Sequence, residues 1–132
     1  MRRWLAGIIV LMPLLANAAG EGAWMASSVG VIMQNRGVAA SSSPLSPPQP
    51  VNGLVTVVQW DYKLVGPTPA NLLVRLCSQS QCVELDAESG STRAFSGIPA
   101  IEPMRFVWDV PGSGRLYPPL QVLSNRVIVN YK

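Results

Sequence analysis

The stretch LVTVVQWDYKL, residues 54–64, alternates between two classes of side chain with a period of two. One face is mostly apolar and carries Leu54, Thr56, Val58, Trp60, Tyr62 and Leu64. The other face becomes polar toward its end and carries Val55, Val57, Gln59, Asp61 and Lys63. This periodicity is typical of a half-buried β-strand, so it predicts a strand of about ten residues.

The same alternation recurs in NLLVRLC (71–77), MRFVWDV (104–110) and NRVIVNY (125–131). The residues predicted to face the core are Leu72, Val74, Leu76, Met104, Phe106, Trp108, Val110, Val127, Val129 and Tyr131. Those predicted to face solvent are Arg105, Asp109, Arg126, Ile128 and Asn130. Near the start of the chain, AWMASS (23–28) and VGVIMQNR (29–36) predict an early strand pair.

Strong breakers separate these runs. GPTPA (66–70), ESGS (88–91), VPGSG (110–114) and YPP (117–119) are all predicted to be turns. With 12 prolines and 11 glycines, few windows could hold a helix of normal length. About six to eight short strands in such a chain indicate an all-β fold, a single-domain antiparallel β-sandwich or small barrel.

The first 18 residues have the pattern of a secretory signal peptide. Arg2 and Arg3 precede an uncharged apolar run over residues 4–15, and the small residues of ANA (16–18) follow. A membrane anchor is the alternative, but the run is shorter than the roughly 20 residues that a spanning helix needs. We therefore expect cleavage after Ala18 and a single β domain over residues 19–132 in the periplasm, with no membrane insertion after signal removal.

Loss of the signal peptide changes the charge of the protein. Removing Arg2 and Arg3 lowers the Lys and Arg count from 10 to 8, against 7 acidic residues, so the net charge falls from +3 to +1. No basic stripe remains, and no nucleic-acid partner is expected.

The segment SSSPLSPPQP, residues 41–50, is rich in proline and serine. Proline cannot donate to a strand ladder and favours extended polyproline geometry. We expect a stiff crossover that carries the chain from the early strand pair to the next sheet. A linker between domains and a proline-rich recognition peptide are the alternatives.

The only two cysteines, Cys77 and Cys82, enclose the four residues 78–81, and the chain has no histidine. A closed zinc site needs four nitrogen or sulfur ligands, and a thioredoxin-like motif has two intervening residues at the start of a helix. Strand-like flanks instead predict a hairpin that brings the two cysteines opposite each other, within the roughly 7 Å that a disulfide requires. In an oxidising compartment we expect a disulfide that stabilises the hairpin by about 2 kcal/mol. Redox and metal roles are the weaker alternatives.

Other catalytic arrangements find little support. There is no histidine base, Lys63 and Lys132 are the only lysines, and no glycine-rich phosphate loop precedes a helix. The candidate carboxylates for a hydrolase stand on polar strand faces or near turns, at Asp61, Glu84, Asp86, Glu88, Glu102 and Asp109. We expect no enzymatic activity, no cofactor and no metal.

Aromatic residues suggest a binding role from another class. Trp60 and Trp108 are in phase with apolar neighbours and are expected in the core, whereas the environment of Trp24 is less determined. We hypothesise that Trp24 is exposed and belongs to a contact surface. A module that binds glycan or peptidoglycan through exposed tryptophans is the alternative function.

Longer motifs cover nearly the whole chain after the signal peptide: AAGEGAW, RGVAASSSPLS, GPTPA, RLCSQSQCVELD, RFVWDVPGSGRL and SNRVIVNY. With these the sequence resembles the flagellar protein FlhE family. The resemblance implies a periplasmic accessory protein of flagellar assembly associated with the membrane export gate. Two roles are implied: restraint of proton leakage through that gate, and a chaperone role toward exported rod or hook subunits. It supplies no set of active residues.

Physical reasoning slightly favours the chaperone role. A β domain with open sheet edges can capture an extended segment by adding it as a strand. A proton seal would need a protein–protein interface, because the chain offers neither a large net charge nor an amphipathic helix. Besides Trp24, the candidate contact residues are the outward charges Arg105, Asp109, Arg115 and Arg126.

Overall fold

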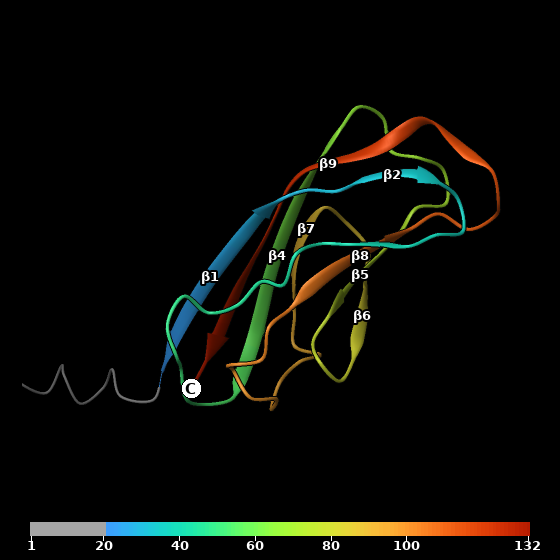
Figure 1. Cartoon of the computed structure of the whole chain (residues 1–132). Helices are drawn as coiled ribbons and strands as arrows, with labels where there is room; N and C mark the ends of the chain where they lie inside the picture. The colour runs from blue at the N-terminus through green and yellow to red at the C-terminus, as the bar shows by residue number, and fades with distance from the viewer. Residues whose placement is uncertain (1–20) are drawn as a thin grey trace, which may run out of the picture.

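The computed structural model describes residues 21–132, which form two antiparallel sheets packed face to face (Figure 1). The first sheet has the order β1 (Gly22–Val29), β9 (Arg115–Tyr131), β4 (Val55–Val65) and β7 (Ser89–Thr92), and β2 (Ile32–Asn35) also pairs with β9. The second has the order β3 (Ala40–Ser41), β8 (Arg105–Asp109), β5 (Leu73–Cys77) and β6 (Cys82–Leu85). The prediction of an all-β sandwich is confirmed, and the barrel alternative is wrong because the sheets stay open.

The expected signal peptide, residues 1–18, lies outside the described residues. Within residues 21–132 there is no helix that could span a membrane.

Strand β9 is the centre of the first sheet. It spans 17 residues and pairs with β4 on one side, from Val55 opposite Tyr131 to Val65 opposite Gln121. On its other side it pairs first with β1 and then with β2. Its last third is the strand predicted for NRVIVNY, with Val127 and Val129 buried as expected.

The predicted turn at YPP, residues 117–119, is wrong, because these residues lie inside β9. Proline is normally excluded from a paired strand since it has no N–H to donate. Here the pairing shifts: Met33 lies opposite Leu120 and Asn35 opposite Arg115, so the two prolines stand in an irregular stretch of the ladder. A bulged segment tolerates them where a regular one would not.

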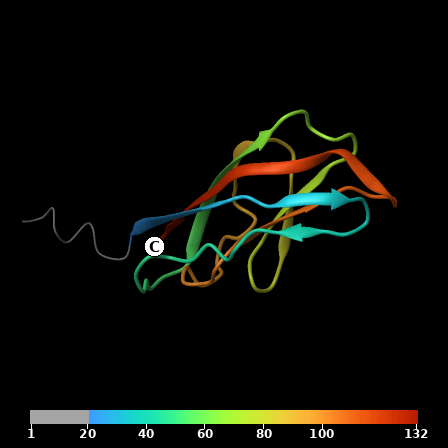
Figure 2. The ribbon, with the colours of Figure 1, turned by 45° about the horizontal axis from the view of Figure 1, so that its top comes forward.

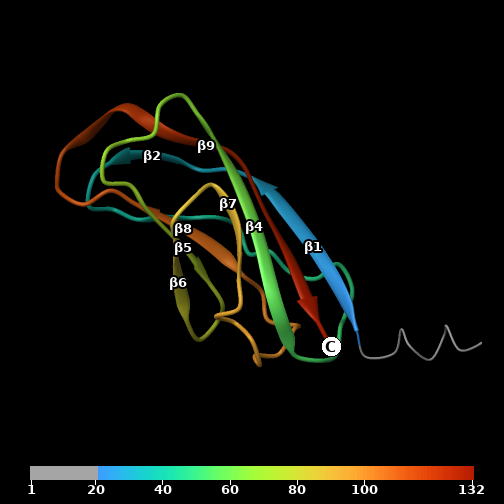
Figure 3. The same ribbon diagram turned by 180° about the vertical axis from the view of Figure 1, so that it is seen from behind.

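The predicted turn at ESGS, residues 88–91, is also displaced. Residues 89–92 form β7, which pairs with β4 over Val58 to Asp61 (Figure 3), and the bend falls at 86–88. Gly90 was the misleading signal. A Cβ at that position would lie 2.7 Å from the Trp60 indole, so glycine is needed for close packing on the ring and not for a turn.

The two early strands were predicted correctly, but they do not pair with each other. Figure 1 shows β1 and β2 following one another along β9, and β9 is the strand that both of them pair with. Gly30 separates them, because a Cβ at Gly30 would overlap the carbonyl group of Val122. The chain therefore needs glycine where it passes Val122 of β9.

Strand β4 departs from strict alternation at its start. Its register shifts between Val55 and Val57, which places Val55 in the core together with Val58. The expectation that Leu54 faces inward is therefore wrong: Leu54 precedes the bulge and is 51% exposed. From Val58 onward the predicted faces hold, with Trp60 and Tyr62 buried.

Aromatic side chains join the two sheets at the centre of the core. Phe106 and Trp108 stand two residues apart on β8 and stack with ring centroids 5.6 Å apart. Tyr62, from β4 of the other sheet, meets both rings edge-on at 6.1 Å. Such pairs contribute about 0.5–1.5 kcal/mol each beyond the apolar area that they bury.

The proline-rich segment 41–50 is a crossover between the sheets, as expected, but the sheets that it connects follow in the opposite order. β3 already belongs to the second sheet, and the segment continues along its edge, where Leu45 and Met104 exchange two backbone hydrogen bonds of 2.7 and 2.9 Å. The chain then returns to β4 in the first sheet. It is thus a crossover from the second sheet to the first, and not the reverse.

The close approach at Gly30 predicts that the variant Gly30→Ala loses about 1–3 kcal/mol of unfolding free energy, since the added methyl group collides with backbone that cannot move aside. Urea denaturation would measure the loss. The control is Ser27→Ala, an exposed position on the neighbouring strand β1, which should change stability by less than about 0.5 kcal/mol. Equal stability of the two variants would contradict the packing described for Gly30.

The buried hydroxyl of Tyr62 should make the folded protein less stable at alkaline pH. Burial raises the pKa of its hydroxyl above the ordinary 10.0, and the carboxylate of Glu88 raises it further. The folded protein therefore holds this proton more tightly than the unfolded chain, and stability falls as pH rises above 10.0 toward the folded pKa. Thermal unfolding between about pH 9 and about pH 11 should show a smaller loss for Tyr62→Phe than for the unaltered protein. The exposed Tyr117→Phe should not reduce that loss, and an equal loss in all three proteins would refute the prediction.

Candidate functional site

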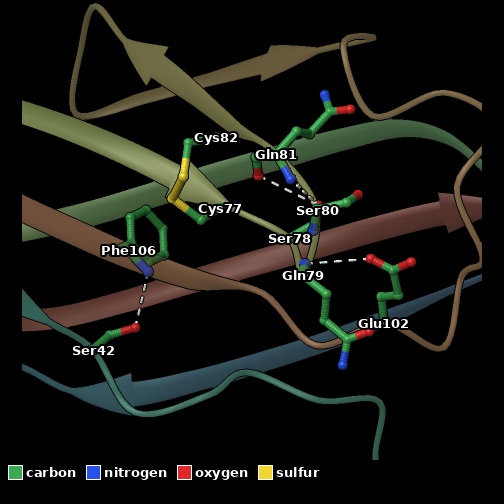
Figure 4. The surroundings of a disulfide bond; sticks show 9 residues. All are labelled: Ser42, Cys77, Ser78, Gln79, Ser80, Gln81, Cys82, Glu102 and Phe106. Carbon is green, nitrogen blue, oxygen red and sulfur yellow. Dashed lines mark hydrogen bonds between the residues drawn. A yellow bond between two sulfur atoms is a disulfide. The ribbon is translucent and has the colours of Figure 1, made fainter.

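The disulfide predicted between Cys77 and Cys82 is confirmed. The two residues are direct partners in the β5–β6 hairpin, with Cα atoms 4.0 Å apart (Figure 4). Cys77 is buried and Cys82 is exposed. The bond therefore closes the loop 78–81 and holds the free edge strand β6 against β5.

The disulfide loop is also held by hydrogen bonds. The Ser78 hydroxyl accepts from the backbone N–H groups of Ser80 and Gln81, at 3.3 and 3.2 Å (Figure 4). The Ser78 N–H donates to the Gln81 carbonyl at 2.8 Å, and the Gln79 N–H donates to the Glu102 carboxylate at 3.3 Å. This arrangement is that of a structural crosslink, because both thiols are joined and residues 21–132 hold no free cysteine.

The hypothesis that Trp24 belongs to a contact surface is wrong. Trp24 is only 5% exposed, and its indole N–H donates to the Ala100 carbonyl at 2.9 Å. It lies on the inward face of β1, which it shares with Gly22 and Ala26. All three tryptophans in residues 21–132 are buried, so this part of the chain offers no tryptophan platform for a sugar.

The four charged candidates point outward but do not form one surface. Arg105 and Asp109 lie on the outer face of the second sheet, whereas Arg126 lies on the outer face of the first. Arg126 forms an ion pair of 2.7 Å with Asp61 on the neighbouring strand. Arg115 starts β9 at the end of the sandwich away from the C-terminus (Figure 1).

A different surface stands out in the structure, which we call the apolar edge. It follows the free side of the first sheet, where β1 and β2 pair with β9 and with no other strand among residues 21–132. Its members are large apolar side chains that face solvent, with Val29 as much as 82% exposed: Met25, Val29, Ile32 and Val38. Four of the nine large exposed hydrophobic residues described thus belong to one edge of the sandwich.

A groove of about 350 Å³ accompanies the apolar edge. It is lined by β2 and by residues 38–40, so it lies between the edge of the first sheet and the edge strand β3 of the second. Figure 2 shows β2 and β3 on this side of the sandwich. The edges of both sheets therefore meet at a hollow with unpaired backbone and exposed apolar side chains. Such an edge can accept an additional strand.

Two further hollows lie near loop 66–71. One, beside Tyr62, includes Asp86 and Glu88, two carboxylates that are exposed at the bend before β7. The other contains Arg36 and Tyr117 at the end of the sandwich. Residues 21–132 hold no cluster of three or more side chains suited to bind a metal ion.

Sequence reasoning missed the apolar edge, although a signal was present. The stretch 25–33 has apolar residues on both faces, which does not fit an edge strand with one face in water. The pairing of β2 with β9 decides which face is buried, and it places Met33 in the core and Ile32 in solvent.

These features define a small, disulfide-linked, all-β protein with exposed apolar residues along one sheet edge. The family model described as flagellar protein FlhE matches residues 30–132. The chain is 63% identical to flagellar protein FlhE of Salmonella typhimurium over the full length of both proteins, and 62% identical to that of Escherichia coli. It is 37% identical to flagellar protein FlhE of Yersinia enterocolitica, over 99% of this chain and 96% of the relative.

A solved structure described as the crystal structure of FlhE superposes with a TM-score of 0.84 and 65% sequence identity, covering 86% of this chain and 99% of the other. The chain belongs to the flagellar protein FlhE family. These relatives are named for the flagellum and not for a reaction, which agrees with a role in flagellar function.

Removal of the disulfide should lower the stability of the protein without loss of the fold. Replacing both Cys77 and Cys82 by alanine should lower the unfolding free energy by about 2 kcal/mol, because the crosslink restricts a short loop in the unfolded chain. The hydrogen bonds of Ser78 should keep the hairpin formed, so the circular dichroism spectrum should not change. A loss of the β spectrum at neutral pH would show instead that the hairpin depends on the bond.

Proposed function

We propose that this protein is a periplasmic accessory factor of flagellar assembly that holds extended segments of exported rod or hook subunits. Membership of the FlhE family supports a flagellar role. The mode of capture is strand addition at the apolar edge, where main-chain hydrogen bonds give affinity and side-chain contacts give selectivity.

The observation that supports this mode best is the exposure of Val29 at the end of β1 and of Ile32 at the start of β2, both on the free edge of the first sheet. Folded proteins usually protect such edges with charged residues, proline or a covering segment, because they invite pairing with other chains. Along β1 and β2 the chain has no charged residue. An edge kept open and apolar suits a protein whose partner supplies the missing strand.

Photo-crosslinking in the periplasm would test this function. A benzophenone amino acid placed at Met25, Val29 or Ile32 should crosslink to rod or hook subunits, identified by mass spectrometry. The control is the same residue at Arg105, an exposed position on the outer face of the second sheet, which should give little or no crosslinked product.

The outcomes separate the competing roles. Crosslinks to export-gate subunits alone would contradict subunit capture and support restraint of proton leakage at the gate. Retention on purified cell wall with no flagellar crosslinks would support glycan binding instead. Equal crosslinking from Arg105 and from the apolar edge would reject this edge as the binding surface.

A further inference from the structure

The hollow that contains Arg36 and Tyr117 lies at the end of the sandwich, and we call it the end cleft. Its volume is about 330 Å³. It is lined by residues 67–71, by Val110 and Pro111, by residues 116–118, and by Arg36 from the turn that follows β2. Val110 and Leu116 are buried, so the cleft has an apolar floor with polar side chains at its rim.

Arg36 is held in place at this rim. Its Nη1 donates to the carbonyl of Arg115 at 2.6 Å, and its backbone N–H donates to the carbonyl of Gly114 at 2.8 Å. A guanidinium group has five N–H donors. The bond from Nη1 to the Arg115 carbonyl is the one side-chain hydrogen bond that Arg36 makes to the residues described. The other N–H donors of its guanidinium group are therefore available to a ligand.

Tyr117 also lines the end cleft. It is 77% exposed, the most exposed aromatic residue described, and the Arg115 guanidinium lies 5.5 Å from its ring centroid. A cation over the ring helps to fix the orientation of an aromatic side chain that the core does not hold. Tyrosine and arginine are also the residue types enriched where binding energy concentrates at interfaces.

The charge of the end cleft is one-sided. No Asp or Glu is among its lining residues, and neither Arg36 nor Arg115 has an ion-pair partner within residues 21–132. Arg126, by contrast, is neutralised by Asp61 on the first sheet. A fixed arginine with free donors and no counter-ion is complementary to a carboxylate, which it can bind with two parallel hydrogen bonds.

We propose that the end cleft binds a carboxylate side chain on an extended segment of a protein partner. Arg36 donates to the carboxylate, while Tyr117 and the proline-lined wall pack against the neighbouring residues of that segment. Arg36 follows directly on the last residue of β2, so a strand added along the apolar edge leads to the cleft. The inference rests on the proposed function for the identity of the partner: a flagellar segment with alternating apolar residues and an acidic residue beyond them.

Binding of a synthetic probe tests the cleft without any flagellar subunit. The probe is a fluorescein-labelled peptide of sequence Val-Thr-Val-Thr-Gly-Asp-Pro-Gly, and its matched partner carries Asn in place of Asp. Fluorescence anisotropy should give an affinity for the Asp peptide about tenfold higher than for the Asn peptide, since a charge-assisted hydrogen bond is lost. Added salt should reduce the difference.

Variants locate the contact. Arg36→Gln and Tyr117→Ala should each weaken binding of the Asp peptide about tenfold, whereas Arg93→Gln, which removes the same charge from an exposed arginine outside the cleft, should change it by less than about twofold. Tyr117 is so exposed that its replacement leaves the core intact, which keeps the test valid if Arg36→Gln disturbs its turn. Thermal unfolding identifies such a disturbance.

Three results would overturn the proposal: equal affinity for the two peptides, equal weakening by Arg93→Gln, or displacement of the probe by N-acetylmuramic acid but not by unlabelled Asp peptide. The two proposals can fail separately. Probe binding at the cleft with no crosslinks from the apolar edge would reject subunit capture and keep the acidic-segment site. Crosslinks from the apolar edge to flagellar subunits, together with equal affinity for the Asp and Asn peptides, would keep subunit capture and reject the acidic-segment site.

Discussion

The main-chain hydrogen bonding of β9 is the constraint on which the rest of this structure depends. This strand pairs with β4 on one side and with β1 and β2 on the other, so it connects the first residues described to the last. Contacts of such long sequence separation form only after the ends of the chain have met, at a cost in loop entropy. Once they form, β9 fixes which residues of β1 and β2 face the core and which face water.

The second sheet depends on that arrangement through side chains. β4 brings Tyr62 over Phe106 and Trp108, and those rings join the two sheets in the middle of the core. The disulfide secures the hairpin at the far side of the second sheet, where β6 has only one neighbour. The edges are treated differently: β6 is linked covalently, whereas β1 and β2 remain open and apolar. This asymmetry is why the apolar edge carries the proposed binding role.

The sequence predicted a large share of the fold. Its alternation located β4, β5, β8 and the end of β9, because each has one face in the core and a period-two pattern that records it. The cysteine spacing predicted the hairpin disulfide for a similar reason, as the geometry involved is local. The errors fall where two effects compete. Gly90 and the YPP segment looked like turns, yet close packing on Trp60 and an irregular ladder opposite β2 keep both in strands.

The functional surfaces were less accessible to sequence reasoning. The family motifs indicated a flagellar role, but the contact residues proposed with it included Trp24, which the structure buries against Ala100. By itself the sequence determined the all-β class, the inward faces of the regular strands and the disulfide, since these follow from patterns within a few residues. The tertiary structure decided which strand is a free edge, and it brought Arg36 and Tyr117 into the lining of one cleft. Those properties depend on pairings between distant segments, and no local pattern encodes which partners a strand will have.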